Sequence, residues 1–332
     1  MPNEKKIPRI VVSKLVPDEV MTDMEGEFIN LNFNKLDSNT FPMLAETDID
    51  IYKENGEILL KFRKNVISKD LCDLAFKNYK SIQMSRGAAS RAGPINEDSK
   101  YWKKRRLVRG KEDKKNSKWM TKYITPEGSV SKMTVSNPVF THVVGYYEAT
   151  PFLNLPCRLT SWTRRNFKKY EAGLPFVEKM NELFKKLAPN KHKIQKKRAD
   201  LKPNFRIKNT AFSTLTLNRN FRTALHLDAG DYKQGIGCLS VVERGHYHGG
   251  YTIFPQYGVA VDIRSGDFIV ADIGGEWHCN TPIYETQDDI RKNKKLKADY
   301  NMKSDRGVEG ENKKYSRITF VCYLRHNLAN CS

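Results

Sequence analysis

Between residues 245 and 271 the chain is a series of short runs rich in β-branched and aromatic residues, separated by turns that contain glycine. Closely spaced short strands of this kind are typical of antiparallel β-sandwiches and barrels. Upstream segments carry apolar residues at helical spacing. We therefore predict the α+β class, with a double-stranded β-helix (jelly-roll) barrel and packing helices on one side. The predicted strand runs lie at 245–255, 259–263 and 268–271.

Two histidines and an aspartate lie on either side of this series in the sequence. His226 and Asp228 precede it, and on an extended strand their side chains share a face, about 6 to 7 Å apart. His278 follows Asp228 by 50 residues. Two imidazoles and one carboxylate form the facial triad of non-haem iron(II) oxygenases, which leaves adjacent coordination positions open. A His-x-Asp pair with a later histidine also occurs by chance, but in this setting we predict that the three side chains are catalytic metal ligands.

The remaining sequence divides around the predicted barrel. Residues 1–57 have few periodic apolar positions, and we expect them to form an extended N-terminal arm. Helices are predicted from 69 to about 82, with Ser68 as N-cap, and from about 175 to 189. We assign the rest to one dioxygenase domain at 58–332, with a half of helices and loops at 58–208, a jelly-roll core at 209–325 and, within it, a basic inserted loop at 284–315.

The chain carries 58 lysine and arginine residues against 38 acidic residues, a formal net charge of +20. This excess favours a polyanionic partner such as nucleic acid, although an anionic membrane surface or a generally lysine-rich composition would also account for it. No apolar run reaches the roughly 18 residues of a membrane-spanning helix, and the N-terminus lacks a signal-peptide apolar segment. We expect an intracellular, non-secreted monomer without a membrane partner, nuclear if the source is eukaryotic.

The spacing of the cysteines bears on metal binding and on disulfides. The six cysteines are scattered, and no two form a C-x-x-C pair. This pattern indicates neither a zinc ribbon nor a disulfide framework, and it suits a reducing compartment.

Two basic segments upstream of the barrel are candidates for DNA binding. Arg86 and Arg91 lie in a loop of small residues, where a backbone can approach a ligand closely, and each could meet a phosphate or a carboxylate. In the second segment, 99–123, basic residues alternate with aromatic ones such as Trp102, which suits a groove where cations neutralise phosphates and rings stack on bases. A solvated linker and a solvated basic face are the alternatives. The basic residues of the second segment include Lys103, Lys104, Arg105 and Arg106.

A β-rich run at 316–323 carries the candidate co-substrate residues. An oxygenase with a dicarboxylate co-substrate needs a cation for the distal carboxylate, and a guanidinium group binds one through two parallel hydrogen bonds. We predict this role for Arg317, with Thr319 on the same strand face as hydroxyl partner; a rim arginine is the alternative. Asp231 either contacts the co-substrate or caps the turn that precedes it.

Several of these segments together resemble the TET/JBP family of iron(II)- and 2-oxoglutarate-dependent dioxygenases. The resemblance covers roughly residues 58 to 325. Two further segments resemble elements of a branch of that family found in algae, fungi and viruses. The family segments are Ala211 through Asp228, Gly249 to Tyr251, Trp277 with His278, and Arg317 to Thr319; the branch segments are 86–89 and 156–160.

The resemblance implies a function and its cofactors. The family oxidises the methyl group of 5-methylcytosine or thymine in nucleic acid, which implies Fe(II) on the triad, 2-oxoglutarate on Arg317, and DNA whose target base is flipped into the site. An algal member of the branch uses ascorbate instead, and Ala211 and Asp231 match the positions that matter there. We expect a 5-methylcytosine dioxygenase that uses 2-oxoglutarate. The alternatives are an ascorbate-dependent enzyme of the same family, an inactive DNA-binding relative, and a hydroxylase of proteins or small molecules.

Overall fold

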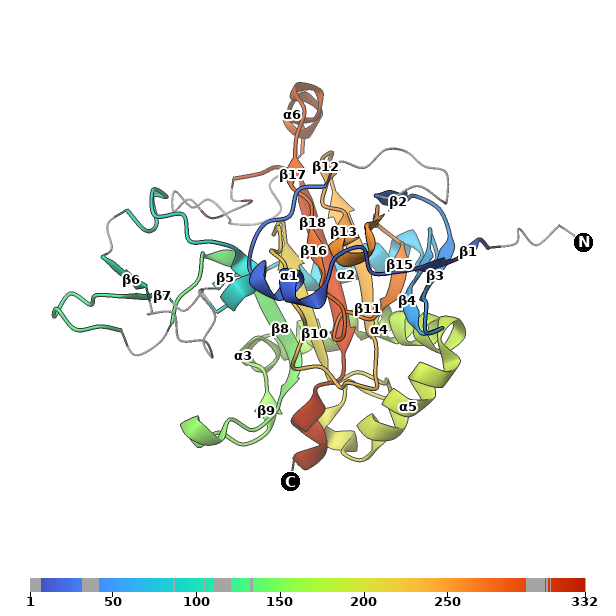
Figure 1. The fold of residues 1–332 in the computed structure, drawn as a ribbon. Coiled ribbons are helices and arrows are strands. Elements are labelled where there is room, and N and C mark those ends of the chain that lie inside the picture. The colour runs from blue at the N-terminus through green and yellow to red at the C-terminus, as the bar shows by residue number, and fades with distance from the viewer. Residues whose placement is uncertain are drawn as a thin grey trace, which may run out of the picture.

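The computed structural model describes residues 7–31, 42–85, 87–103, 106–109, 121–131, 134–296, 308, 310 and 312–331, and every structural statement below concerns these residues. Their centre is formed by a sheet of ten strands and a sheet of four (Figure 1). The runs predicted at 268–271 and 316–323 are strands of these sheets. The run at 245–255 contains two short strands instead of one, and the run at 259–263 is a strand only as far as Val261. This mixed α+β architecture agrees with the predicted class.

The strands are paired mainly antiparallel, and short ladders complete the arrangement. In spatial order the large sheet contains β1 (Arg9–Val12), β3 (Ile49–Lys53), β4 (Ile58–Arg63), β15 (Phe268–Ala271), β11 (Gly237–Arg244), β18 (Ser316–Tyr323), β10 (Thr214–Arg219), β8 (Val139–Tyr147) and β5 (Met84–Ser85), with β9 (Arg158–Leu159) on β8; the small sheet contains β16 (Cys279–Asn280), β13 (Thr252–Phe254), β14 (Val259–Val261) and β2 (Met43–Ala45); β12 (His248–Gly249) pairs with β17 (Ile283–Tyr284), and β6 (Leu107–Arg109) with β7 (Thr121–Tyr123).

Both faces of the large sheet are buried, and they serve different purposes. Successive side chains of a strand point to opposite faces. On β18, Phe320 and Cys322 belong to the hydrophobic core shared with the helices. Val321 and Tyr323 belong instead to the core between the two sheets. Residues at odd positions of β18 therefore face the space where the candidate site lies.

Helices cover the first of these faces. In α2 (Lys69–Tyr79) the hydroxyl of Ser68 accepts a hydrogen bond from the backbone N–H of Leu71, so the predicted N-cap is confirmed. The second predicted helix begins earlier than expected, because α4 spans Phe167–Leu187 with Pro175 inside it. Burial of Tyr170 and Leu174 in the core offsets the hydrogen bond that the proline removes. The next helix, α5, spans Pro189–Asp200.

The N-terminal segment is part of both sheets, which corrects the expectation of an arm. Strand β1 pairs in parallel with β3, and β2 pairs in parallel with β14. Between them, α1 (Asp18–Asp23) buries Met21 in a small core with Leu225 and Trp277. The predicted boundary at residue 57 falls inside the β3–β4 hairpin. Burial of apolar residues such as Val12 and Ile51 is the physical reason.

The prediction of an inserted loop at 284–315 is wrong for its first part, which contains a helix. Residues Gln287–Asn293 form α6, which begins with a capping box: Thr286 accepts a hydrogen bond from the backbone N–H of Asp289, and the Asp289 carboxylate accepts one from the backbone N–H of Thr286. Such reciprocal hydrogen bonds stabilise a short helix at its start. The central part of the insertion, 297–307, lies outside the described residues.

The described part of the chain contains one disulfide, which the scattered cysteines did not indicate. Cys157 and Cys331 are bonded, with 5.8 Å between their Cα atoms and a sequence separation of 174. Only the fold brings two such distant residues together, so no spacing rule could have predicted the pair. The other four cysteines are buried and unpaired. Among the helices described, none is long and apolar enough to cross a membrane.

Candidate active site

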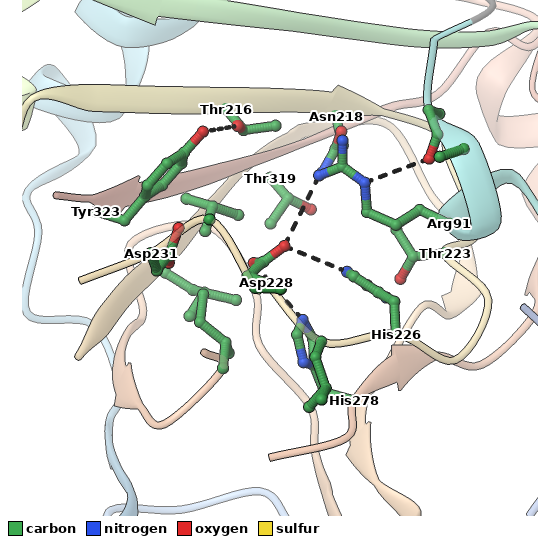
Figure 2. Close-up of a pocket in the computed structure, with 18 of the residues that line it drawn as sticks. Arg91, Thr216, Asn218, Thr223, His226, Asp228, Asp231, His278, Thr319 and Tyr323 are labelled. Carbon is green, nitrogen blue, oxygen red and sulfur yellow. Dashed lines mark hydrogen bonds and ion pairs between the residues drawn. The ribbon is translucent and has the colours of Figure 1, made fainter. Parts of the chain in front are cut away.

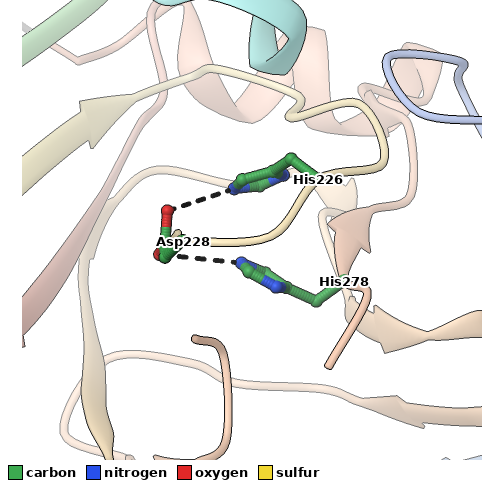
Figure 3. A group of neighbouring side chains, drawn as sticks. All are labelled: His226, Asp228 and His278. Atoms are coloured by element: carbon green, nitrogen blue, oxygen red, sulfur yellow. Dashed lines mark ion pairs between the residues drawn. The ribbon is translucent and has the colours of Figure 1, made fainter. Parts of the chain in front are cut away.

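Three side chains with metal-ligating atoms converge between the two sheets (Figure 3). The backbones of His226 and His278 are joined by two N–H···O hydrogen bonds of 3.1 Å. This pairing holds the ring centroids 4.2 Å apart. The Asp228 carboxylate faces both rings, with Oδ1 at 3.7 Å from Nε2 of His226 and Oδ2 at 3.8 Å from Nε2 of His278. The structure therefore brings together the three residues that the spacing suggested.

Each imidazole is oriented by a backbone carbonyl group. Nδ1 of His226 donates to the oxygen of Ala224 at 2.7 Å, and Nδ1 of His278 donates to that of Glu276 at 3.1 Å. Because a carbonyl oxygen can only accept, each Nδ1 carries the proton and each Nε2 presents a lone pair toward Asp228. Hydrogen bonds of this kind fix the tautomer and the ring orientation of metal-ligating histidines.

The environment keeps both rings neutral and the carboxylate charged. Burial, together with the neighbouring His278, lowers the pKa of His226 to about 3. Burial likewise lowers the pKa of His278. For Asp228, burial acts to raise the pKa, but the two imidazoles and Arg91 outweigh it and hold that pKa below its ordinary value. The resulting donor set, two neutral nitrogens and one carboxylate, suits divalent iron.

A cavity of about 280 Å³ opens onto these ligands (Figure 2). Arg91 lies on a short 3-10 turn and points toward Asp228, with its Nη1 3.8 Å from Oδ1 of that residue. Its Nε donates to the carbonyl oxygen of Ala88 at 3.4 Å. Arg91 was predicted to bind DNA, and the structure places it at the metal-ligand cavity.

Arg317 is 2% exposed and is not among the residues that line this cavity, whereas Thr319, two residues further along β18, lines it. Nη1 of Arg317 donates to Oγ1 of Thr319 at 2.6 Å, as expected for residues two apart on one strand face. Asn220 fixes the start of β18, because its side-chain oxygen accepts from the backbone N–H of Arg317 at 2.7 Å. Nε and Nη2 of Arg317 have no hydrogen-bond partner among the described residues. Such buried, unsatisfied donors fit an anionic ligand.

The two other predicted co-substrate residues lie in different surroundings. Asp231 lines the cavity, and its Oδ2 has no hydrogen-bond partner among the described residues. Burial and the nearby charge of Asp228 raise the pKa of Asp231 well above its ordinary value. Ala211 instead is fully buried in the core against the helices, where its backbone N–H donates to Asn181, and it is not part of the cavity wall. The geometry offers Ala211 no direct contact with a ligand in this cavity.

Several cavity residues were missed from the sequence. Tyr323 follows Thr319 on the same face of β18, and its hydroxyl group lies 3.1 Å from that of Thr216. Nη2 of Arg325 lies 3.4 Å from the hydroxyl oxygen of Tyr323, and Nη1 of Arg325 lies 3.5 Å from Oε1 of Glu148. The two-residue period that linked Arg317 to Thr319 could have identified Tyr323. Other wall residues that sequence reasoning missed are Asn218, Thr223 and Asn280.

Two further predicted DNA-binding residues, Lys103 and Arg106, are described and do not line the cavity. Lys103 and Arg106 are exposed. Trp102, which we expected to stack on bases, is instead 1% exposed, and its indole N–H donates to the side-chain oxygen of Asn137 at 3.2 Å. This part of the predicted groove is therefore core. The other predicted residues, Arg86, Lys104 and Arg105, lie outside the described residues.

Comparison with known families gives this geometry a context. The Tet_JBP model, described as the oxygenase domain of the 2OGFeDO superfamily, matches residues 142–326, more than half of the chain. The chain belongs to this family. The family implies Fe(II) and 2-oxoglutarate, and the matched segment contains all three metal-ligand candidates as well as Arg317 and Thr319.

Individual relatives extend the comparison. The bifunctional helicase and thymine dioxygenase JBP2 of Trypanosoma cruzi is 33% identical over 193 residues, 57% of this chain and 15% of the relative. Thymine dioxygenase JBP1 of Leishmania major is 35% identical over 144 residues, 42% of this chain and 17% of the relative. The chain thus spans less than a fifth of these relatives. The solved structure of NgTET1 in complex with 5mC DNA is similar in fold, with a TM-score of 0.51, 12% identity and coverage of 95% and 94% of the two chains.

Proposed function

We propose that this TET/JBP-family oxygenase oxidises the 5-methyl group of a pyrimidine base in DNA, 5-methylcytosine or thymine, with Fe(II) and 2-oxoglutarate. One observation carries the proposal. The triad of His226, Asp228 and His278 borders a cavity lined by Thr319, and Arg317, hydrogen-bonded to Thr319, has two buried donors without a partner among the described residues. The proposal includes closure of the two sheets into a jelly-roll barrel with the site at its mouth.

The residues fit the metal that the family implies. Two neutral imidazoles with free Nε2 lone pairs and one carboxylate would bind ferrous iron from one side, leaving positions for the co-substrate and dioxygen. When bound, the iron couples oxidative decarboxylation of 2-oxoglutarate to insertion of one dioxygen oxygen atom into the methyl C–H bond, releasing succinate and carbon dioxide. The carbonyl groups of Ala224 and Glu276 hold the two rings in the required orientation.

The co-substrate fits beside the triad. Nε and Nη2 of Arg317 form the planar fork that binds a carboxylate through two hydrogen bonds, and the neighbouring Thr319 adds a hydroxyl group at the cavity wall. Burial strengthens this pairing because little water competes for the guanidinium. In this arrangement Arg317 would bind the distal carboxylate and orient the other end of the molecule toward the triad.

DNA is the proposed substrate for two reasons. The named relatives are thymine dioxygenases, and the structurally similar NgTET1 was solved with 5mC DNA. The net charge of +20 independently favours a polyanion. Because a base methyl group inside a duplex cannot reach a buried metal, the target base would have to flip into the cavity.

The direct test is a turnover assay. Purified protein is incubated anaerobically with Fe(II) and methylated or unmodified duplex DNA, air is admitted with or without 2-oxoglutarate, and the nucleosides are analysed by mass spectrometry. We expect an oxidised 5-methylpyrimidine with an equimolar amount of succinate. DNA binding without any oxidised base would favour the inactive relative, and 2-oxoglutarate turnover without DNA binding would favour a protein or small-molecule hydroxylase.

Asp231 supports a second candidate, the ascorbate-dependent enzyme. Its unpartnered Oδ2 lines the cavity and could accept a hydrogen bond from a hydroxyl group of ascorbate, whereas 2-oxoglutarate has no hydroxyl group to donate. If ascorbate is the co-substrate, Asp231→Ala should lower ascorbate-supported product formation roughly 2- to 10-fold, the value of one hydrogen bond between neutral groups. Asp231→Asn, which keeps an acceptor oxygen, should lose less. Activity that requires 2-oxoglutarate and releases succinate would exclude this candidate.

A further inference from the structure

A second and larger cavity lies next to the metal-ligand cavity. Its volume is about 990 Å³, and it is formed by the end of α2, by β5 and β8, and by α3 (Ser161–Arg165). In Figure 1, α3 lies near β8 and β5, which form one edge of the large sheet. Arg91 and Val143 line both cavities. The two spaces are therefore neighbours, and nothing in the proposed chemistry uses the second.

The wall of the second cavity is cationic. Lys80, Arg91 and Arg165 line it, and its described lining contains no aspartate or glutamate. The ring of His142 adds no charge near neutral pH, because burial lowers its pKa to about 4 and its Nε2 accepts the backbone N–H of Gln83. Hydroxyl groups of serines 81, 85 and 161 complete the lining. Cations with hydroxyl donors and no acidic residue favour a phosphate ligand.

Only a thin partition separates this cationic cavity from the triad. Thr141 lines the second cavity and Asn218 lines the first, and their side chains are joined by a hydrogen bond of 2.7 Å. Arg91 passes beside this partition and reaches within 3.8 Å of Asp228 (Figure 2). A nucleotide with its base at the triad would carry its phosphates to the rim of that cavity, where Arg91 marks the boundary.

We propose that the second cavity binds the phosphodiester backbone that flanks the target base. The identity of the polymer as DNA rests on the proposed function. The inference adds where the sugar-phosphate backbone of that DNA lies on the protein. The main phosphate contacts are then made by Lys80, Arg91 and Arg165, and not by the predicted segment around Trp102, which is buried.

Two neighbouring arginines of α3 provide a matched test. Arg164 and Arg165 are both exposed, but only Arg165 lines the cavity. Arg164→Gln and Arg165→Gln remove the same charge from the same helix. Binding of an unmodified 20-base-pair duplex is measured by fluorescence anisotropy across a sodium chloride series, without iron or co-substrate. Each lost phosphate contact should reduce the slope of log affinity against log salt by about 0.9.

We expect the slope for Arg165→Gln to be shallower than that for Arg164→Gln by about 0.9. Lys80→Gln, as a second variant, should change the slope by a similar amount, and circular dichroism verifies that each variant is folded. Equal slopes for Arg164→Gln, Arg165→Gln and Lys80→Gln would overturn the inference. Single-stranded DNA and RNA of equal length identify which polymer the cavity prefers.

The two proposals can fail separately. The binding assay uses no metal, co-substrate or methyl group, so a selective effect of Arg165→Gln would stand even if the turnover assay found no oxidised base. Conversely, turnover on methylated DNA with equal slopes for all three variants would keep the proposed chemistry and refute only the location of the backbone.

Discussion

Asp228→Ala is expected to abolish product formation while leaving the protein folded. Asp228 supplies the only carboxylate of the triad, so its loss leaves two neutral imidazoles for a divalent ion. Residues that merely orient a metal ligand contribute about 10- to 100-fold to metal affinity, so loss of a ligand itself should cost more than about 100-fold. Anaerobic calorimetric titration with Fe(II) measures this loss, and nucleoside mass spectrometry measures the loss of product.

A second aspartate provides the control for this variant. Asp73 is ion-paired with Lys69 on α2 and does not line the metal-ligand cavity, so Asp73→Ala should keep both iron binding and turnover. Thermal unfolding should give midpoints within a few degrees for the two variants and the unsubstituted protein. Normal product formation by Asp228→Ala would refute the assignment of the triad.

Arg317→Met should raise the Michaelis constant for 2-oxoglutarate by roughly 30- to 150-fold, because a charge-assisted bidentate pair contributes about 2 to 3 kcal/mol. Methionine keeps an unbranched apolar stem in a site where the guanidinium has two unsatisfied donors, so its packing should be tolerated. Initial rates at varied 2-oxoglutarate give the constant. Fe(II) affinity and duplex affinity should stay near those of the unsubstituted protein.

Arg317→Lys separates charge from geometry. Lysine keeps the positive charge but lacks the planar fork, so its Michaelis constant should fall between those of the unsubstituted protein and Arg317→Met. An unchanged Michaelis constant in Arg317→Met, in a protein that releases succinate, would instead point to another cation at the cavity. Arg91 and Arg325, which both line it, would then be the candidates.

Much of the site followed from local sequence periodicity. The two-residue spacing of Arg317 and Thr319 predicted that they share a strand face, and their hydrogen bond of 2.6 Å on β18 agrees. His226 and Asp228 also lie close together, but not on the predicted strand, because His226 forms only an isolated bridge with His278. The strand runs around residues 245–271 were predicted from β-branched and aromatic residues between glycine turns, and the N-cap from a serine directly before a helical pattern. Alternation along a strand and a cap at a helix start depend on neighbours within a few residues, so the sequence alone determines them.

Only the tertiary structure decided which distant segments meet. It placed Arg91 beside Asp228, put Trp102 in the core rather than on a DNA surface, and joined Cys157 to Cys331 across 174 residues. It also placed the N-terminal strands in the two sheets, and Ala211 in the core instead of the cavity wall. Long-range contacts of this kind depend on how all the elements pack at once, because burial of each apolar face requires a partner surface elsewhere in the chain. No periodicity within one segment encodes that partner.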